Sequence, residues 1–494
     1  MMRIIWILVI VGVSIYPAFS FANNLSLSNG AVISTNTSAD TAVVEFDISW
    51  DNSWRDGTNW DAVWLFMKYD TGSGWAHATI SSYSSVGTGT ALNIVITQDK
   101  RGCFIERSGT GSGTCSTSNV RLVWDYGDDG VDDADIENVD LRIFGIEMVY
   151  IPAGGFYVGD GSSSASLKQG STDTDPWYIG SEAAISVEDV NSNAYYYVSG
   201  GNAGEDALGA DFIIPNSFPK GYGDFYVMKY EITQGQYADF LNTVAEDQAV
   251  NRFPDQNGNN RHTITGTYPD YIASRPYRAC NFLSWPDVAA YADWAALRPV
   301  TELEYEKMAR GKDILPVAGE LPWGNTSITA ATSLSGAENG TETVSNASAN
   351  GCYNNQTFID GDGGQGPLRA GIFAIATSTR QQSGSGYYGI MELAGNVWER
   401  CVSIGNSTGR SFQGTHGDGV LETASGYEGN ATTADWPGYT SGQGVSAGTG
   451  AGLKGGSWLE TTTGKMAVSD RTEAALGDSE RVSDTGGRCG RTND

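Results

Sequence analysis

The sequence predicts an all-β N-terminal domain followed by a larger, loop-rich α+β domain. Apolar and polar residues alternate with a period of two over residues 24–144, which is typical of half-buried strands. After residue 144, the spacing typical of amphipathic helices is found in three short segments. Glycine is abundant, with 64 among 494 residues, so much of the chain between these segments is expected to be turn and loop.

The N-terminal domain is predicted from three alternating runs separated by turns of Gly, Ser, Asp and Asn. In these runs every second residue is apolar, beginning at Val44, Val63 and Val120. Such strands are typical of an antiparallel, immunoglobulin-like β-sandwich, which we assign to residues 23–145. The acidic turn at 125–135 approaches a calcium loop, but its register is imperfect and no Glu stands at the twelfth position. A calcium loop and a solvated acidic turn both remain open there.

The first 22 residues have the composition of a secretory signal peptide. Arg3 precedes an apolar run over residues 4–15, and residues 20–22 have the small-x-small form of a cleavage site. An apolar run of about 12 residues is short for a membrane span, which needs roughly 20. We therefore expect residues 1–22 to be removed and the protein to be secreted, extracellular or at the cell surface, with no membrane span.

Export makes disulfides possible, and the chain has six cysteines. Cys103 and Cys115 lie close together in the N-terminal domain, where they could close a small loop. The remaining four allow three pairings, among which the sequence does not decide. These four are Cys280, Cys352, Cys401 and Cys489. Free buried thiols are the alternative.

The composition excludes nucleic-acid partners. The chain has 58 acidic and 29 basic residues, a formal net charge of -29, and no run of Lys or Arg. A nucleic-acid-binding protein needs a concentrated basic surface to displace counterions from phosphates. In contrast, 40% of the residues are hydrophobic and 11% aromatic, which is enough apolar material for folded cores.

The second domain is assigned to residues 146–494, with long insertions at about 159–223 and 405–450. A capping box precedes each of its three predicted helices, because a Ser or Thr is followed three residues later by Gln, Asp or Glu. The pairs are Thr233 with Gln236, Ser284 with Asp287, and Thr301 with Glu304. A region with so few helices is expected to need disulfides or bound metal as further constraints.

The second domain also carries a series of short motifs in a characteristic order. The longest is Gly395-Asn396-Val397-Trp398-Glu399 with the residues before it from 388, and Gly455-Gly456-Ser457-Trp458 follows later. The others lie at residues 148–156, 230–233, 283–285, 297–302, 322–325 and 487–491. Together these motifs resemble those of the formylglycine-generating enzyme (sulfatase-modifying factor) family. The resemblance implies a C-type-lectin-like fold, with much irregular structure around a small mixed sheet.

The resemblance also implies a reaction, the oxidation of a cysteine in a client sulfatase to formylglycine. The family's copper(I) is held by two cysteines that follow the Gly-Gly-Ser-aromatic motif, and the matching positions here are Glu460 and Lys465. Copper(I) selects soft thiolates, whereas a carboxylate is a hard ligand and an ammonium repels the cation. We therefore expect no copper, assign no catalytic residue, and lean against an enzyme.

A sister branch of the family binds iron through three histidines. This chain has only His77, His262 and His416, and none of them forms a pair at helical spacing. We therefore expect no iron.

Calcium is the family feature that this sequence retains. The resemblance implies one ion bound by the side chains of Glu392 and Glu399 and the carbonyls of Gly395 and Val397. A second, weaker match implies an ion near Asn350, Gly351, Asp362 and Gly364. Hard oxygen ligands suit Ca²⁺, and either ion would be structural because it would tie loops together. Glycine turns with acidic residues that only favour solubility are the alternative at both places.

Three functions follow from these observations. The first is a secreted, non-catalytic protein, a pseudoenzyme that uses the scaffold for binding or adhesion to an extracellular protein or glycan. The second is a structural subunit of an extracellular filament or surface layer, in which the segment 25–33 adds as a strand to another copy. The third is an oxidase or oxygenase of the same family with altered chemistry.

Overall fold

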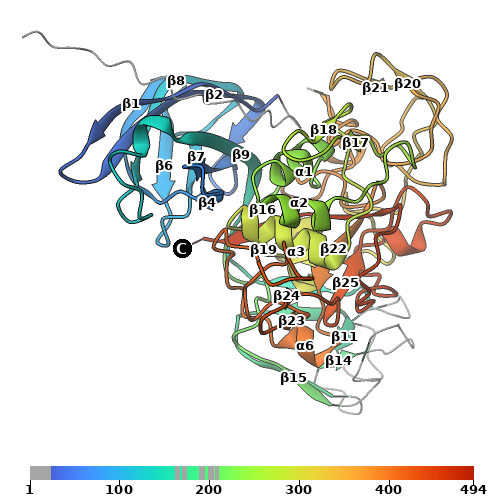
Figure 1. Ribbon diagram of the computed structural model, residues 1–494. Helices are drawn as coiled ribbons and strands as arrows, with labels where there is room; N and C mark the ends of the chain where they lie inside the picture. The colour runs from blue at the N-terminus through green and yellow to red at the C-terminus, as the bar shows by residue number, and fades with distance from the viewer. Residues whose placement is uncertain are drawn as a thin grey trace, which may run out of the picture.

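The computed structural model describes residues 24–161, 167–169, 175–188, 195–197, 205, 211–375 and 377–493. The predicted signal peptide at 1–22 lies outside the described residues. Figure 1 shows the N-terminal sheets on one side of the molecule and the helices and loops of the second part on the other. In the described part of the chain, every helix is too short or too polar to cross a membrane.

Two antiparallel sheets form the N-terminal part. The first has the order β1-β2-β8-β5, and the strands of the second that lie in this part have the order β9-β3-β7-β6 with β4 paired to β3. The bounds are β1 Ser26–Asn36, β2 Thr41–Arg55, β3 Asp61–Asp70, β4 Trp75–His77, β5 Ile80–Gly89, β6 Leu92–Ile96, β7 Cys103–Arg107, β8 Gly111–Asp125 and β9 Asp140–Ile151. Side chains of both sheets share one buried core, in which Phe46 and Trp124 of the first sheet pack with Leu65 of the second. Burial alternates along β2, as predicted.

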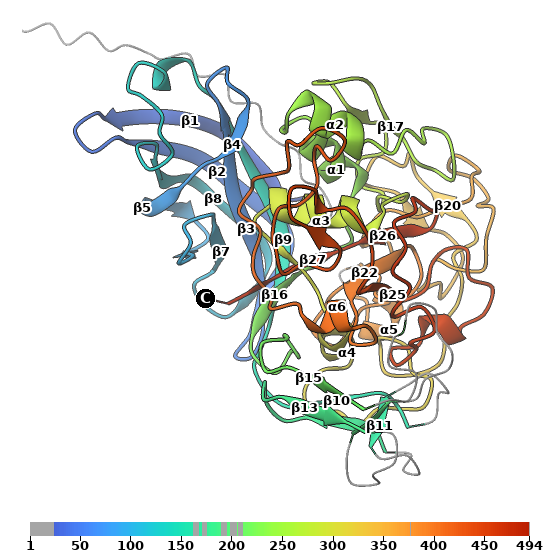
Figure 2. The ribbon, with the colours of Figure 1, turned by 60° about the horizontal axis from the view of Figure 1, so that its bottom comes forward.

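Strand β9 continues across the predicted domain boundary and joins the two parts. It pairs with β16 (Phe225–Met228), which pairs with β27 (Cys489–Thr492), which in turn pairs with β19 (Arg298–Pro299). One eight-stranded sheet therefore contains strands of both parts. Figure 2 shows β3, β9, β16 and β27 where the N-terminal part meets the second part. Backbone hydrogen bonds fix the N-terminal part to the second part.

The central strand β3 is buried on both faces. Val63, Leu65 and Met67 belong to the core between the two N-terminal sheets, whereas Trp64 and Phe66 belong to the core of the second part. The indole N–H of Trp64 donates to the carbonyl of Ala295 at 2.8 Å. A strand that packs on both faces needs a nearly continuous apolar run, and residues 62–67 supply one.

The three predicted helices are confirmed, and each starts at its capping box. They are α1 (Gln234–Leu241), α3 (Trp285–Trp294) and α4 (Glu302–Arg310), with caps at Thr233, Ser284 and Thr301. The sequence did not predict the shorter helices α2 (Glu246–Arg252), α5 (Arg380–Ser383), α6 (Ser407–Arg410), η1 (Ile136–Asn138) and η2 (Gly464–Met466). Every residue of α3 is buried, so this helix is the centre of the second part rather than a surface element.

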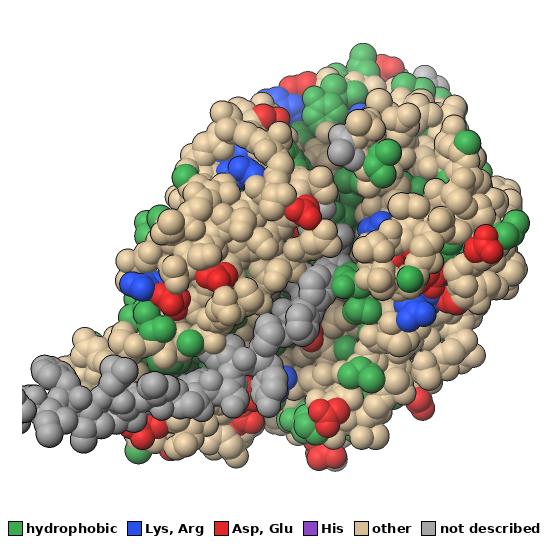
Figure 3. Space-filling model, turned by 90° about the horizontal axis from the view of Figure 1, so that it is seen from above, with side chains coloured by type: hydrophobic (Ala, Val, Ile, Leu, Met, Phe, Trp, Pro, Cys, Tyr) green, Lys and Arg blue, Asp and Glu red, His purple; other side chains and the backbone are tan. Residues whose placement is uncertain are grey.

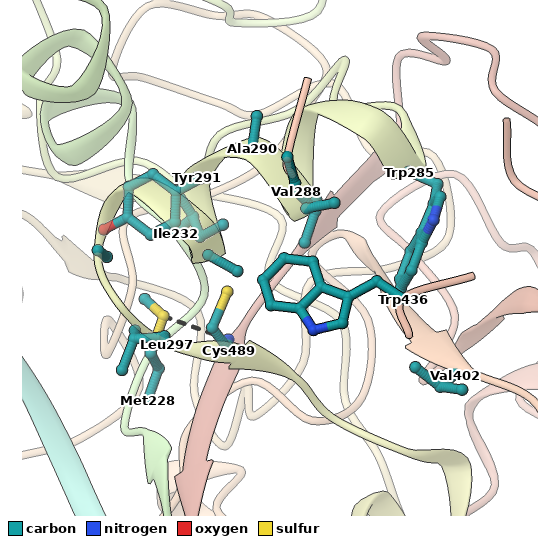
Figure 4. Close-up of a cluster of buried hydrophobic side chains, with 14 of the residues drawn as sticks. Met228, Ile232, Trp285, Val288, Ala290, Tyr291, Leu297, Val402, Trp436 and Cys489 are labelled. Atoms are coloured by element: carbon teal, nitrogen blue, oxygen red, sulfur yellow. Dashed lines mark hydrogen bonds between the residues drawn. The ribbon is translucent and has the colours of Figure 1, made fainter. Parts of the chain in front are cut away.

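Helix α3 packs its side chains against strands β16 and β27 and against a distant loop. Figure 4 shows Val288 and Tyr291 of α3 beside Met228 and Cys489, with Trp436 on the other side. The backbone N–H of Cys489 donates to the sulfur of Met228 at 3.3 Å. This cluster anchors the C-terminal strand, and Trp436 brings the predicted insertion 405–450 into the core.

The two predicted insertions are more ordered than surface loops. Within 159–223, the described strands form a sheet of order β11-β14-β13-β15, and β12 pairs with β10 (Phe156–Val158). The bounds are β11 Leu167–Gln169, β12 Trp177–Ile179, β13 Ile185–Val187, β14 Tyr195–Tyr197 and β15 Phe212–Ile214. Within 405–450, Phe412 and Trp436 are fully buried. The predicted insertions therefore contribute to the fold.

The remaining strands are short. β22 (Trp398–Val402), β25 (Ala451–Lys454) and β26 (Thr485–Gly487) form a three-stranded sheet. Three hairpin-like pairs complete the described strands: β17 (Ile264–Thr265) with β18 (Ile272–Ala273), β20 (Leu334–Ser335) with β21 (Thr343–Val344), and β23 (Tyr439–Thr440) with β24 (Gly444–Val445). The whole is β-rich with few helices, as predicted.

The predicted disulfides are absent, because all six cysteines are free and buried. Cys103 and Cys115 lie on β7 and β8, which belong to different sheets, and each packs as an apolar side chain in the core between them. Burial raises the pKa of Cys115 to about 11 and that of Cys352 to about 12. These side chains therefore stay protonated at neutral pH and act as small apolar groups.

Buried ion pairs take the place of disulfides as cross-links in the second part. Arg298 binds Glu304 at 2.6 Å, and Arg471 binds Glu302 at 2.6 Å, with all four side chains at most 1% exposed. Removing one partner of such a pair leaves a buried charge uncompensated, which costs roughly 3–5 kcal/mol. The charged residues of α4 are thus part of the core.

The surface agrees with the acidic composition. In the view of Figure 3, the Lys and Arg side chains stand singly among Asp and Glu side chains.

Candidate functional site

The candidate site lies on the segment that follows β25. Gly455 and Gly456 both have positive φ, and a Cβ at 456 would lie 2.5 Å from the side chain of Met466. The hydroxyl of Ser457 donates to the carboxylate of Asp484 at 2.7 Å, and the indole N–H of Trp458 donates to the carbonyl of Ser483 at 3.2 Å. These bonds fix the direction of the chain just before Glu460.

Glu460 and Lys465 lie together and form an ion pair. The ammonium of Lys465 is 3.6 Å from a carboxylate oxygen of Glu460 and 3.0 Å from one of Glu473. It also lies 5.7 Å from the centre of the Trp398 ring. Burial alone would lower the pKa of Lys465, but the hydrogen bond to Glu473 and the two carboxylate charges outweigh it and raise the pKa. The site therefore holds a protonated amine between two acids, at the protein surface.

A second group of charged side chains lies deeper, around Arg488. Its guanidinium donates to both carboxylate oxygens of Glu399, at 2.6 and 2.7 Å. Glu392 accepts one hydrogen bond, from the backbone N–H of Gly371 at 2.8 Å, and its other oxygen is buried without a partner. Glu231 accepts from the side chain of Asn396 and from the N–H of Val397.

Three buried carboxyl groups thus surround one guanidinium. Burial raises the pKa of Glu392 to about 7. Burial, together with the charges of Glu392 and Glu399, raises the pKa of Glu231 well above its ordinary value. Burial thus favours the neutral form of Glu231 and Glu392, whereas Arg488 and Arg369 oppose this at Glu392.

The second part of the chain, which carries the ordered motifs, is similar to known proteins. Residues 144–492 match the family model described as the sulfatase-modifying factor enzyme 1-like domain. The chain belongs to this family. The formylglycine-generating enzyme of Thermomonospora curvata is 34% identical over 131 residues, and the match covers 26% of this chain and 35% of that enzyme. This chain therefore matches about a third of the length of that curated relative.

Within this sulfatase-modifying factor domain, the first predicted calcium site partly fits a cation. The unpartnered, buried oxygen of Glu392 favours one. However, both oxygens of Glu399 are occupied by Arg488. No group of three or more His, Cys, Asp or Glu side chains in the described residues has an arrangement that could hold a metal. An ion here would thus rely on the carbonyls of Gly395 and Val397 as well as on Glu392.

The residues of the second predicted calcium site do not fit a cation. Asp362 forms ion pairs with Arg278 at 2.5 Å and Arg261 at 3.4 Å, and these positive charges oppose a metal. The side-chain oxygen of Asn350 accepts from the N–H of Thr329 at 2.8 Å. The carbonyls of the two remaining residues, Gly351 and Gly364, accept from Ala331 and Phe358. The four predicted ligands therefore have separate partners.

The acidic turn at 125–135 uses its carboxylates within the protein. Asp129 accepts from the backbone N–H and the hydroxyl of Thr79 and from the indole N–H of Trp124, at 2.7–2.8 Å. Asp133 accepts from the hydroxyl of Tyr126 at 2.6 Å. These bonds close the turn against the sheet.

The three histidines bond to three different parts of the chain. One ring nitrogen of His77 lies 2.5 Å from the carbonyl of Arg101, and one of His262 lies 3.0 Å from the side chain of Asn281. His416 accepts from the backbone N–H of Thr492 at 3.0 Å.

Sequence reasoning missed several residues of both clusters. Glu231 and Arg488 lie in motifs that carried the family resemblance, so their positions were identified but not their roles. Glu473 lies eight residues after Lys465, and nothing in the sequence pattern marks it.

Proposed function

We propose that this chain is a secreted, non-catalytic member of the sulfatase-modifying factor family that uses its scaffold for extracellular binding or adhesion. The observation that carries the proposal is the ion pair between Lys465 and Glu460, at the positions matched to the copper-binding cysteines. An ammonium held between two carboxylates offers no soft ligand to copper(I). In this proposal the N-terminal part is an immunoglobulin-like sandwich that serves as a second binding or spacing module, joined to the family domain through the shared sheet.

The remaining thiols do not supply a substitute copper site. All six cysteines are buried, and burial raises the pKa of Cys352 to about 12. Cys352 is linked to the site through the backbone, because Asn354, two residues later, donates its N–H to the carbonyl of Glu460. A buried, protonated thiol binds copper(I) poorly, since the thiolate is the ligand.

The test is copper binding and peptide oxidation by the purified protein. We expect no copper(I) binding in competition with a chelator, and no aldehyde from a cysteine-containing sulfatase peptide with copper and oxygen. The double variant Glu460→Cys with Lys465→Cys is the matched control, because it restores two thiols at the pair and should gain copper(I) binding. Aldehyde formation by the unsubstituted protein would contradict the proposal.

We further propose that a structural Ca²⁺ binds at Glu392 and the carbonyls of Gly395 and Val397. The support is the buried oxygen of Glu392 that has no partner. A hard carboxylate and two carbonyls are suitable ligands for calcium. The ion would hold the turn at residues 392–397 and would take no part in a reaction.

A second candidate function is supported by the position of β1. This strand lies at the edge of its sheet, so one side of its backbone is not paired within the described residues. Ile33 is 43% exposed on it. An exposed edge strand can accept a strand from another copy, as a filament subunit would require. Electron microscopy of the secreted protein tests this, since monomers under all conditions would contradict it.

A further inference from the structure

The shared sheet buries one amine between two acids where the N-terminal part meets the second part. Lys229 directly follows β16, Asp61 is the first residue of β3, and Glu147 lies on β9. The ammonium of Lys229 lies 3.3 Å from a carboxylate oxygen of Glu147 and 3.6 Å from one of Asp61. All three side chains are at most 3% exposed. Strands β3 and β9 therefore supply two buried acids, and the segment after β16 supplies a buried amine.

The backbone holds these three residues in position. In the register of β3 with β9, Asp61 is opposite Val149, two residues from Glu147, so both acids lie on the same face of the sheet. The N–H of Lys229 donates to the carbonyl of Glu147 at 2.9 Å, and its carbonyl accepts from the N–H of Met391 at 2.9 Å. The short distances between the side chains thus follow from the strand pairing.

The surroundings of the amine are aromatic rather than aqueous. The ammonium of Lys229 lies 4.9 Å from the centre of the Trp54 ring and 5.5 Å from that of Tyr230. Burial, opposed chiefly by the charge of Lys229, raises the pKa of Asp61. Desolvation thus favours the neutral carboxylic acid at Asp61. Transfer of a proton from the ammonium to this carboxylate leaves a neutral amine, which is a nucleophile, beside a neutral acid.

Hydrogen-bond donors are directed at the carboxyl group of Asp61. The hydroxyl of Ser53 and the backbone N–H of Trp54 donate to its Oδ1 at 2.9 and 3.0 Å. The indole N–H of Trp50 donates to its Oδ2 at 3.0 Å, the oxygen that lies 3.6 Å from Lys229. Attack on a carboxyl carbon builds negative charge on its oxygen, and fixed donors stabilise that charge. The carboxyl group is therefore both oriented and polarised.

We propose that Lys229 and Asp61 form an intramolecular isopeptide bond, with Glu147 as the proton carrier. The amine nitrogen of Lys229 attacks the γ-carbon of Asp61, a C–N bond forms, and a C–O bond breaks. The carboxylate of Glu147 takes a proton from the attacking nitrogen and delivers it to the leaving oxygen, which departs as water. The products are one amide and one water, so the step needs no oxidant, reductant or co-reactant.

The position of the reacting groups favours this step. Fixed groups near the contact distance of roughly 3–3.5 Å react far faster than free ones, because their encounter entropy is already lost. Lys229 also lines a cavity of about 360 Å³, into which the released water can pass. Trp54 lines the same cavity, so it opens beside the amine.

Lys465 provides a contrast within the same chain. Its amine also lies near two acids, 3.6 Å from Glu460 and 3.0 Å from Glu473, but it is 37% exposed. The hydrogen bond to Glu473 and the two carboxylate charges raise the pKa of Lys465, so this amine stays protonated and does not attack. We therefore expect no bond at Lys465, where the same groups lie at the surface.

The bond supplies a covalent cross-link that the six free cysteines do not. Asp61 and Lys229 lie on opposite sides of the boundary between the two parts, so their bond ties the N-terminal part to the second part. A cross-link between such distant residues restricts the unfolded chain, as a disulfide does. This inference goes beyond the proposed binding function and does not depend on copper or calcium.

The test is mass spectrometry of the purified full chain, reduced and denatured, with its N-terminus determined. We expect a mass lower than that of the sequence by one water molecule. Trypsin should release a branched peptide in which residues 56–68 are joined to residues 221–252, because trypsin does not cleave after an acylated lysine. A mass equal to that of the sequence, or a branched peptide at Lys465 instead, would overturn the proposal.

Three variants assign the roles. Lys229→Met removes the amine and Glu147→Gln removes the proton carrier, so both should show the full mass of their sequences. Lys100→Met is the matched control, since Lys100 pairs with Asp128 on the surface at 3.4 Å, and this variant should still lose one water. A complete loss of water in either of the first two variants would overturn the assignment.

The measurement stays decisive if a variant does not fold. The mass of the unsubstituted protein tests the bond without any substitution, and Glu147→Gln preserves the size of the side chain if Lys229→Met proves unstable. Copper binding and aldehyde formation are measured separately and concern Glu460 and Lys465. Failure of the isopeptide proposal is therefore distinguishable from failure of the pseudoenzyme proposal.

Discussion

The ammonium of Lys465 lies 3.6 Å from the carboxylate of Glu460, at the two positions where the family resemblance expects a pair of copper-binding thiolates. The pair is at the surface, with the Lys465 side chain 37% exposed. An ion pair in such a position contributes little to stability, typically below about 1 kcal/mol. We therefore expect the fold to depend little on this pair.

A double-mutant cycle tests this independence. We expect Glu460→Ala and Lys465→Ala to couple by less than about 1 kcal/mol in the free energy of unfolding, measured by urea denaturation. Glu473 lies nearer to Lys465, at 3.0 Å, but both side chains are partly exposed. We therefore expect Glu473→Ala and Lys465→Ala also to couple by less than about 1 kcal/mol. A coupling well above this range would mean that the pair is part of the folded core.

Arg488 is predicted to be far more important for stability than any surface arginine. Arg488→Met leaves Glu399 without its partner, beside the buried carboxyls of Glu231 and Glu392, and should cost roughly 3–5 kcal/mol. Arg121→Met is the matched control, since Arg121 also pairs at 2.6 Å, with Glu45, but is 44% exposed. We expect that control to cost below about 1 kcal/mol. Equal losses in the two variants would contradict the assignment of Arg488 to the core.

Calcium removal should lower the melting temperature if the ion binds at Glu392. At a free calcium concentration of about 100 to 1,000 times the dissociation constant, the ion adds about 3–4 kcal/mol to stability. Glu392→Gln should remove the difference between melting with calcium and melting with EDTA. Asp362→Asn should leave that difference intact, because Asp362 is bound by two arginines. Identical melting of the unsubstituted protein in calcium and in EDTA would exclude the site.

Local features of the fold were predictable from the sequence, whereas pairing between distant segments was not. The capping residues Thr233, Ser284 and Thr301 identified three helix starts, because a cap depends on residues three positions apart. The pairing of Ile151 with Phe225 brings together strands separated by the whole segment 159–223. The period of a strand does not show which distant strand it pairs with. The sequence therefore did not predict the sheet that contains both β9 and β16.

The candidate site was predictable only where a motif fixed the spacing. Counting from Ser457 located Glu460 and Lys465, and the structure brings them together. Glu473 and the role of Arg488 depend on how loops return to the site, which no local pattern encodes. The disulfide prediction was wrong for a different reason, since cysteine spacing does not distinguish a cross-link from a small apolar side chain in a core.

The six thiols provide a direct test of that correction. We expect the unfolding midpoint to be the same with and without a reducing agent, because losing a native disulfide would cost about 2–5 kcal/mol. A water-soluble thiol reagent should react slowly with the folded protein and should titrate six thiols after denaturation. Fewer than six reactive thiols in the unreduced, denatured protein would reveal a disulfide.

Asp239 should make the protein less stable as the pH rises toward neutrality. This half-buried residue of α1 lines a small gap with Phe66, Phe144 and Trp294, and desolvation there, opposed by the charge of Arg142, raises the pKa of Asp239 from 3.8 to about 7. Between about pH 4 and pH 7 the unfolded chain has released this proton while the folded protein retains it. Stability therefore falls through this window and levels off above it.

Asp239→Asn removes the ionisable group and should flatten this part of the stability profile. At pH 8 the variant should be more stable by about 1–3 kcal/mol, whereas near pH 4 the two proteins should be similar, because Asp239 is then neutral in the folded state. Asp247→Asn, at an exposed position of α2, is the control and should follow the unsubstituted protein. Urea denaturation at intervals between pH 4 and pH 8 measures the difference. Parallel profiles for the Asp239→Asn variant and the unsubstituted protein would show that the carboxyl is solvated rather than buried.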